Sequence, residues 1–150
     1  MMMTNMMTAM KTSISEVLET MFYLPVEFSQ DARLSDAGLD DSAPVMACEL
    51  GFSGEIQGKL ILVVPRNLLA GMTENFMGET AAPGDDALLE GTLTETLNMI
   101  CGNMLGRLET RDPLELGIPM KLDTLDSSAD DMFTIIETIG AKMAIRLVVA

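Results

Sequence analysis

The chain is organised around residues 91–106, which read GTLTETLNMICGNMLG. At about 3.6 residues per turn, the apolar residues in and beside this stretch predict a helix over residues 87–109 with one continuous apolar side. That side consists of Leu89, Leu93, Leu97, Ile100, Met104 and Leu108. We expect it to face a core, so that the opposite side of the helix faces outward.

The outward side of this predicted helix carries Glu95 and Asn98, together with Gly91, Gly102 and Gly106. Glycine in a helix interior is about 1 kcal/mol less favourable than alanine. Three glycines in one helix therefore require some compensation, and close approach by another backbone would supply it.

A second interpretation of the same side is that Glu95 and Asn98 simply solvate an amphipathic helix, because a glutamate three residues before an asparagine often arises by chance. The neutral residues Thr94 and Thr96 argue against it, since we expect them on the outer face and an exposed helix normally carries more charge. A flat outer face that bears an amide suggests docking of a partner.

The length and composition predict one globular domain. The 150 residues suit a single core, and the contents of 48% apolar and 21% charged residues exclude a disordered chain. We assign residues 8–150 to this domain and expect residues 1–7 to form a flexible tail. The chain has no apolar run long enough to cross a bilayer and no signal-peptide pattern at its start. We therefore expect a cytoplasmic protein without a membrane partner.

Charge and residue usage limit the possible chemistry. The net charge of −14 would be repelled by phosphate backbones, so nucleic acid is not an expected partner. Histidine is absent, which excludes imidazole bases and the commonest ligand of transition metals. Cys48 and Cys101 are too few for a zinc site, and we interpret both as small buried hydrophobes. Any chemistry must use carboxylates, amides or hydroxyls.

The remaining pattern predicts an α+β fold with a largely antiparallel sheet and two long helices packed on one face. The expected elements are a helix over residues 8–23, a loop over 29–41 with at most a short strand at its start, strands at 45–52, 55–64, 132–139 and 142–149, and a short helix over 65–77. Ser13 and Thr8 are possible caps of the first helix, and residues 60–64 suit a strand buried on both faces.

No metal site is expected in this chain. The aspartates Asp123, Asp126, Asp130 and Asp131 lack the spacing and terminal glutamate of a calcium loop. We interpret them as part of a solvated loop.

The segment Glu95 to Asn103, reading ETLNMICGN, resembles the CheC/CheX/FliY family of chemotaxis phosphatases, and CheX most closely. The preceding helix and hairpin, Pro119 and the closing hairpin extend the resemblance over most of the chain. It implies a CheC-like fold and a phosphatase that removes phosphate from the aspartate of a CheY-type receiver protein. The glutamate and asparagine of the family motif correspond to Glu95 and Asn98 here, and Gly91 and Gly102 would flank them on the docking face.

The roles implied by this resemblance are chemically reasonable. The receiver supplies its own aspartate, lysine and bound Mg²⁺, so this chain needs no cofactor and lacks only a positioned water. The amide of Asn98 can both donate and accept hydrogen bonds and could hold that water in line. A carboxylate is a weak base at neutral pH, so Glu95 is better suited to anchor the receiver lysine.

Departures from the family pattern leave alternatives open. Gly91 occupies a position that is often acidic or hydroxyl-bearing, and the first helix carries Glu16 and Glu19 without an asparagine, so we expect one site per chain. A non-catalytic module that binds a receiver or a component of the flagellar switch is the main alternative, and an ordinary dimerisation domain is a third. The resemblance also implies a homodimer joined through its sheets, for which we expect the edges of the C-terminal hairpin to serve.

Overall fold

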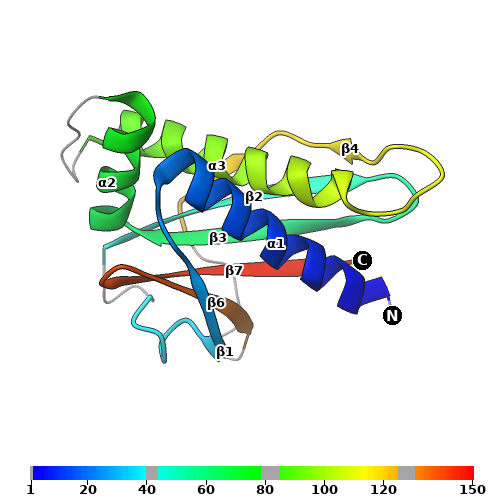
Figure 1. Ribbon diagram of the computed structural model, residues 1–150, viewed down its shortest axis with the longest axis horizontal. Coiled ribbons are helices and arrows are strands. Elements are labelled where there is room, and N and C mark those ends of the chain that lie inside the picture. The colour runs from blue at the N-terminus through cyan, green and yellow to red at the C-terminus, as the bar shows by residue number, and fades with distance from the viewer. Residues whose placement is uncertain (1, 40–43, 79–84, 125–130) are drawn as a thin grey trace.

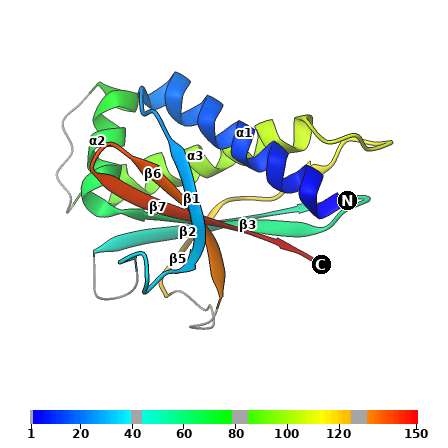
Figure 2. The ribbon, with the colours of Figure 1, turned by 60° about the horizontal axis from the view of Figure 1, so that its bottom comes forward.

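The computed structural model describes residues 2–39, 44–78, 85–124 and 131–150, except for the side chain of Met77. It shows three helices on one face of an antiparallel sheet (Figures 1 and 2), which confirms the predicted fold class. The helices are α1 (Met2–Phe22), α2 (Arg66–Met77) and α3 (Asp86–Gly106). Among the described helices, none is both long and apolar enough to pass through a membrane.

Within the described residues the sheet has seven strands in the order β1-β6-β7-β3-β2-β4, and β5 also pairs with β2. The strands are β1 (Glu27–Arg33), β2 (Val45–Ser53), β3 (Gly58–Pro65), β4 (Glu115–Leu116), β5 (Met120–Leu122), β6 (Met132–Thr138) and β7 (Ala141–Val149). The β2–β3 and β6–β7 hairpins are those that the sequence predicts. They lie side by side because β3 pairs with β7, from Gly58 opposite Val149 to Val63 opposite Ala144.

Two apolar cores lie on opposite faces of the sheet, and β3 contributes to both. Leu60, Leu62 and Val64 belong to the larger core between the sheet and the helices. Ile61 and Val63 belong to the smaller core on the other face. The prediction that residues 60–64 are buried on both faces is therefore confirmed, and β3 is the central strand around which the layers assemble.

The amino-terminal segment differs from its prediction. Residues 2–7 are the first turns of α1 rather than a flexible tail, and Met6 is only 1% exposed. The reason is that Met6 continues the apolar stripe of Met10 and Ile14 at a spacing of four residues, so these turns bury a side chain in the larger core. Ser13 is likewise not a cap, because it lies in the middle of α1.

The short strand allowed at the start of the predicted loop over residues 29–41 is present as β1, which begins earlier, at Glu27, and extends to Arg33. The sequence of β1 is polar because β1 is an edge strand, and its only strand partner in the described chain is β6. By contrast, β6 and β7 lie inside the sheet, between β1 and β3. The expectation that the C-terminal hairpin offers free edges was therefore wrong.

Two short strands that the sequence does not signal, β4 and β5, pair with the outer edge of β2. The Gly117 N–H between them donates a hydrogen bond of 2.7 Å to the Gly51 carbonyl oxygen. A Cβ atom at Gly117 would lie 3.0 Å from that same oxygen, so the close approach of the two backbones favours glycine here. This contact holds the segment that follows α3 against the sheet.

The start of α3 is tied to the start of α2 by an ion pair of 2.5 Å between Arg66 and Asp86. The hydrogen bond from Arg66, together with its charge, lowers the pKa of the Asp86 carboxyl. A carboxylate in the first turn also suits the positive end of the helix dipole.

Candidate functional site

The candidate site lies on the side of α3 that points away from the sheet. Five residues of the predicted apolar stripe are completely buried in the larger core: Leu89, Leu93, Leu97, Ile100 and Met104. Leu108 lies beyond the end of the helix and is half-buried. At about 100° per residue, Gly91, Glu95, Asn98 and Gly102 fall on the opposite side, and we call these four residues the outer strip.

Glu95 and Asn98 lie side by side on the outer strip and have no partner within the described chain. Glu95 is exposed and Asn98 is half-buried. Neither side chain takes part in a hydrogen bond or ion pair among the residues that the structure describes. A carboxylate and an amide are thus both free to bind a group from another molecule.

The two threonines beside Glu95 have different surroundings. Thr94 is half-buried and donates to the Glu90 carbonyl oxygen at 3.0 Å. Thr96 is completely buried and donates to the Thr92 carbonyl oxygen at 2.6 Å. Placing Thr96 on the outer face was therefore wrong, because its position on the helix turns it toward the larger core.

The glycines of α3 are not required by contacts within the chain. A Cβ atom at Gly91 or Gly106 would have no heavy atom within 4 Å, and one at Gly102 would meet only Leu116 Cδ1, at 3.7 Å. None of the three has a positive φ. Within the described residues no backbone of another element lies within 4 Å of a Cβ at these positions, so the close approach predicted from the sequence is not made there.

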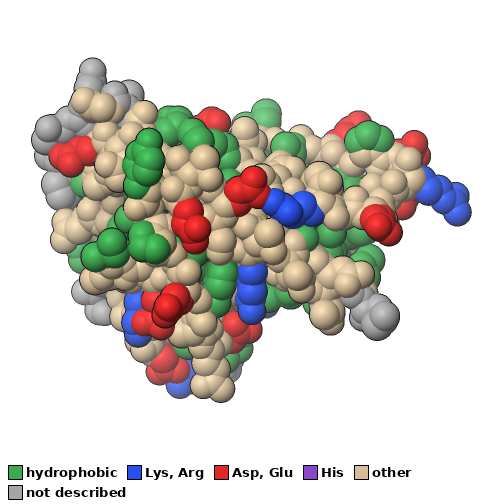
Figure 3. All heavy atoms as spheres, in the orientation of Figure 1, with side chains coloured by type: hydrophobic (Ala, Val, Ile, Leu, Met, Phe, Trp, Pro, Cys, Tyr) green, Lys and Arg blue, Asp and Glu red, His purple; other side chains and the backbone are tan. Residues whose placement is uncertain are grey.

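Beside Gly102, the outer strip borders a shallow cavity of about 410 Å³ between α3 and the segment that follows it. Leu105, Pro113, Leu114 and Leu116 contribute apolar lining. On the side of the molecule shown in Figure 3, charged side chains are scattered and no large basic patch is present. The net charge of −14 would repel a highly charged polyanion, and the apolar lining beside Gly102 is better suited to a protein partner.

Helix α1 does not repeat this site. The Glu16 carboxylate forms an ion pair with Arg107, which follows α3. A carboxylate engaged within the chain is not free to bind a partner, in contrast to Glu95. This contact is consistent with the expectation of a single site per chain.

Both cysteines are buried and unpaired, which confirms their interpretation as small hydrophobes. Burial raises the pKa of each thiol, Cys48 and Cys101, to about 12. The thiolate, which is the nucleophilic form, is therefore not populated at neutral pH. Neither cysteine is a candidate for covalent catalysis.

Within the described residues, no three side chains of His, Cys, Asp or Glu lie together in a way that could hold a metal ion. Asp131 forms an ion pair of 2.9 Å with Arg146. Asp126 and Asp130, which belong to the predicted acidic loop, lie outside the described residues.

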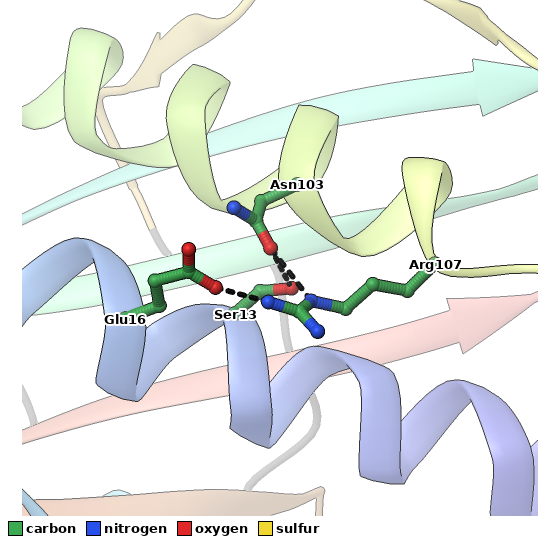
Figure 4. Close-up of polar contacts among 4 residues, drawn as sticks. All are labelled: Ser13, Glu16, Asn103 and Arg107. Carbon is green, nitrogen blue, oxygen red and sulfur yellow. Dashed lines mark hydrogen bonds and ion pairs between the residues drawn. The ribbon is translucent and has the colours of Figure 1, made fainter.

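One polar cluster was missed by the sequence analysis. Asn103 Oδ1 accepts a hydrogen bond of 2.9 Å from the Ser13 hydroxyl and one of 2.8 Å from Arg107 Nε (Figure 4). Asn103 belongs to the segment that carries the family resemblance, and this was the only available signal. Its partner Ser13 is 90 residues away in the sequence, so no local pattern could identify the contact.

Comparison with solved structures shows that the chain has the fold of CheX and FliY proteins. CheX from Vibrio vulnificus is 16% identical, with a TM-score of 0.76 and coverage of 97% of this chain and 96% of the other. CheX from Borrelia burgdorferi, solved in a complex with CheY, BeF3 and Mg²⁺, is 14% identical, with a TM-score of 0.72 and coverage of 95% and 96%. FliY from Thermotoga maritima is also 14% identical, with a TM-score of 0.60 and coverage of 95% and 84%. At these identities the likeness shows the fold alone.

The family itself is established by sequence. A sequence model of the family described as chemotaxis phosphatase CheX matches residues 46–132, which is more than half of the chain. No curated protein sequence gives a significant match. The chain belongs to the CheX family.

The substitution Gly91→Ala should stabilise the protein by about 0.5–1 kcal/mol, because the added methyl group meets no atom and alanine loses less conformational entropy on folding. Urea unfolding followed by circular dichroism measures the change. The matched variant Gly58→Ala should destabilise, because its Cβ would lie 2.4 Å from the Val148 carbonyl oxygen. A loss of stability in Gly91→Ala would show that the fold does require this glycine.

Proposed function

We propose that this protein is a phosphatase that hydrolyses the phospho-aspartate of a CheY-type receiver domain. The observation that carries the proposal is the free pair Glu95 and Asn98 on the outer strip of α3. Membership of the CheX family supports this activity. The solved complex of a structural relative with CheY supports a receiver as the partner.

In the proposed mechanism, Asn98 positions the attacking water. In-line attack on an aspartyl phosphate requires a water oriented toward phosphorus on the side opposite the leaving carboxylate. The amide of Asn98 can accept a hydrogen bond from this water through its oxygen and can donate to the phosphoryl group through its nitrogen. The amide contributes by holding the water in the in-line position, which a free water molecule adopts only rarely.

Glu95 is proposed to anchor the active-site lysine of the receiver. A carboxylate that has no partner within its own chain can form a charge-assisted hydrogen bond with an ammonium group at little cost in broken contacts. This pairing would place Asn98, one turn further along α3, over the phosphoryl group. The receiver's own Mg²⁺ would neutralise charge on the phosphoryl oxygens.

A non-catalytic adaptor that binds a receiver or a flagellar switch component is the alternative function. The same fold in FliY from Thermotoga maritima is compatible with such a module. An adaptor would use the outer strip for docking but would not depend on the amide of Asn98. A substitution of Asn98 therefore distinguishes the phosphatase from the adaptor.

Homodimerisation is part of the same proposal, and the edge formed by β4 and β5 is the best candidate for it. In the described chain, no strand pairs with the outer edges of β4 and β5. Leu116, Ile118 and Met120 in this segment are 41%, 82% and 61% exposed. An apolar edge favours pairing with another sheet, whereas the opposite edge carries the charged residues of β1.

The first prediction of the proposal is that Asn98→Ala abolishes accelerated dephosphorylation of the receiver. Loss of water orientation should lower the catalysed rate by on the order of 100-fold. The measurement is phosphate release from phosphorylated receiver with Mg²⁺ and catalytic amounts of the protein. Binding to the receiver should persist, and the control Glu90→Ala, an exposed glutamate outside the outer strip, should keep the wild-type rate. Undiminished catalysis in Asn98→Ala would exclude the mechanism.

The second prediction is that Glu95→Gln weakens the productive complex more than it slows the bound reaction. Loss of a charge-assisted hydrogen bond should raise KM by roughly tenfold or more, corresponding to about 1.5–3 kcal/mol. The kinetic constants are obtained from initial rates over a range of phosphorylated receiver. An unchanged KM together with a reduced kcat would show that Glu95 acts on the reaction and does not anchor the receiver.

The third prediction is a solution dimer of about twice 16.2 kDa at micromolar concentration, measured by light scattering. Ile118→Lys should yield a monomer, because it places charge on the apolar edge. The control Ile139→Lys changes an isoleucine of similar exposure, 75%, in the β6–β7 turn and should remain a dimer. A monomeric wild-type protein would contradict the proposed dimer. A dimeric Ile118→Lys variant would show that the edge formed by β4 and β5 is not the interface.

A further inference from the structure

Apart from the exposed ion pair between Arg66 and Asp86 at its first residue, two hydrogen bonds between described helices hold α3, one on either side of the candidate site. Near its start, the hydroxyl groups of Thr92 and Thr73 lie 2.8 Å apart and join α3 to α2. Near its end, Asn103 and Ser13 join α3 to α1. We propose that Thr92 and Asn103 are positioning residues, which set the rotation of α3 about its axis and thereby the direction of Glu95 and Asn98. This inference rests on the proposed phosphatase function.

The contact at the end of α3 is a cluster of linked polar contacts and not a single hydrogen bond at the surface. The Ser13 hydroxyl is completely buried, so its orientation is defined by its surroundings. Asn103 Oδ1 accepts hydrogen bonds from both Ser13 and Arg107. Arg107 in turn forms an ion pair with Glu16 on α1 (Figure 4). One acceptor oxygen on α3 is thus held by donors that are both fixed to α1.

The contact at the start of α3 is buried throughout. Thr73 is fully buried and Thr92 is 2% exposed. The Thr73 hydroxyl also lies 2.9 Å from the Leu69 carbonyl oxygen, within its own helix. Because neither hydroxyl can turn to water, breaking the pair would leave the buried Thr92 hydroxyl without a partner in the described chain, whereas Thr73 would keep its bond to Leu69.

The positions of the two contacts on α3 make them suited to control rotation. Thr92 and Asn103 are separated by eleven residues, or about three turns, so they fall within about 20° of each other around the helix. Glu95 and Asn98 lie between them along the axis, on a different side. A helix held at two points along one side cannot turn without breaking a hydrogen bond.

Apolar packing alone defines this rotation less well. Burial of the leucine stripe is favourable but has no directional preference, whereas a hydrogen bond weakens steeply when it is misaligned. A turn of about 10° displaces an atom roughly 6 Å from the axis of a helix by about 1 Å. An error of that size in a catalytic group can cost on the order of 100-fold in rate.

The test compares Asn103→Leu, which removes the acceptor at similar size, with Asn103→Asp, which keeps an acceptor oxygen. Asn103→Leu should lower kcat for phosphorylated receiver by on the order of tenfold to 100-fold. KM should change less, because the longer Glu95 side chain can adapt. Asn103→Asp should restore kcat to within a few-fold of the wild type. Thr92→Val, an isosteric change at the other contact, should lower kcat in the same way.

A second measurement does not depend on catalysis. Spin labels at Glu19→Cys and Glu90→Cys report the distance between α1 and α3, and the buried native thiols do not compete for the label. We expect a single narrow distance in the wild-type background, a shifted or broadened one with Asn103→Leu, and recovery with Asn103→Asp. Circular dichroism verifies that each variant is folded at the temperature of measurement.

The outcomes separate this inference from the proposed function. If the wild-type protein does not accelerate dephosphorylation, the proposed function fails, and the spin-label distances alone decide whether Asn103 sets the position of α3. Unchanged distances in Asn103→Leu would overturn the inference, and so would wild-type kcat in that variant. Failure of Asn103→Asp to restore both quantities would overturn it as well, because the acceptor oxygen would not then be the relevant group.

Discussion

Burial of one side of α3 against the sheet is the constraint on which the rest of the structure depends. Leu89, Leu93, Leu97, Ile100 and Met104 are completely buried between the sheet and the helices. A helix that commits one side to a core must turn the opposite side outward. The position of Glu95 and Asn98 on the surface follows directly, without any contact of their own within the described chain.

The outer strip is accessible to a partner but lowers the stability of α3. A helical glycine with open space around it, such as Gly91, weakens a helix that alanine would strengthen. Two side chains capable of hydrogen bonding also have no partner in the described chain. Binding sites commonly break the rules that stabilise the rest of a fold. The remainder of α3 offsets this weakness through its apolar stripe and its polar contacts with α1 and α2, which include the ion pair between Asp86 and Arg66.

The chemistry available to the chain agrees with a role in positioning. Histidine is absent from the sequence, and both thiols are buried with a pKa raised to about 12. Neither an imidazole base nor a thiolate nucleophile can therefore act at neutral pH. An amide and a carboxylate remain, and they suit the proposed reaction, in which the partner would supply the metal ion and the phosphorylated group and this chain would orient the water.

The sequence by itself determined those features that depend on local periodicity. The helical spacing of the leucines predicted α3, the apolar run at residues 60–64 predicted the doubly buried strand, and the Glu95 and Asn98 positions predicted the outward pair. Features that depend on distant contacts were decided only by the tertiary structure. The polar strand β1 forms because β6 lies beside it, β4 and β5 form because β2 has an open edge, and the amino-terminal turns form because Met6 finds a core. The bond between Ser13 and Asn103 joins residues 90 positions apart. Local spacing identifies which side of an element is apolar, but a hydrogen bond between elements exists only once packing has brought its donor and acceptor together.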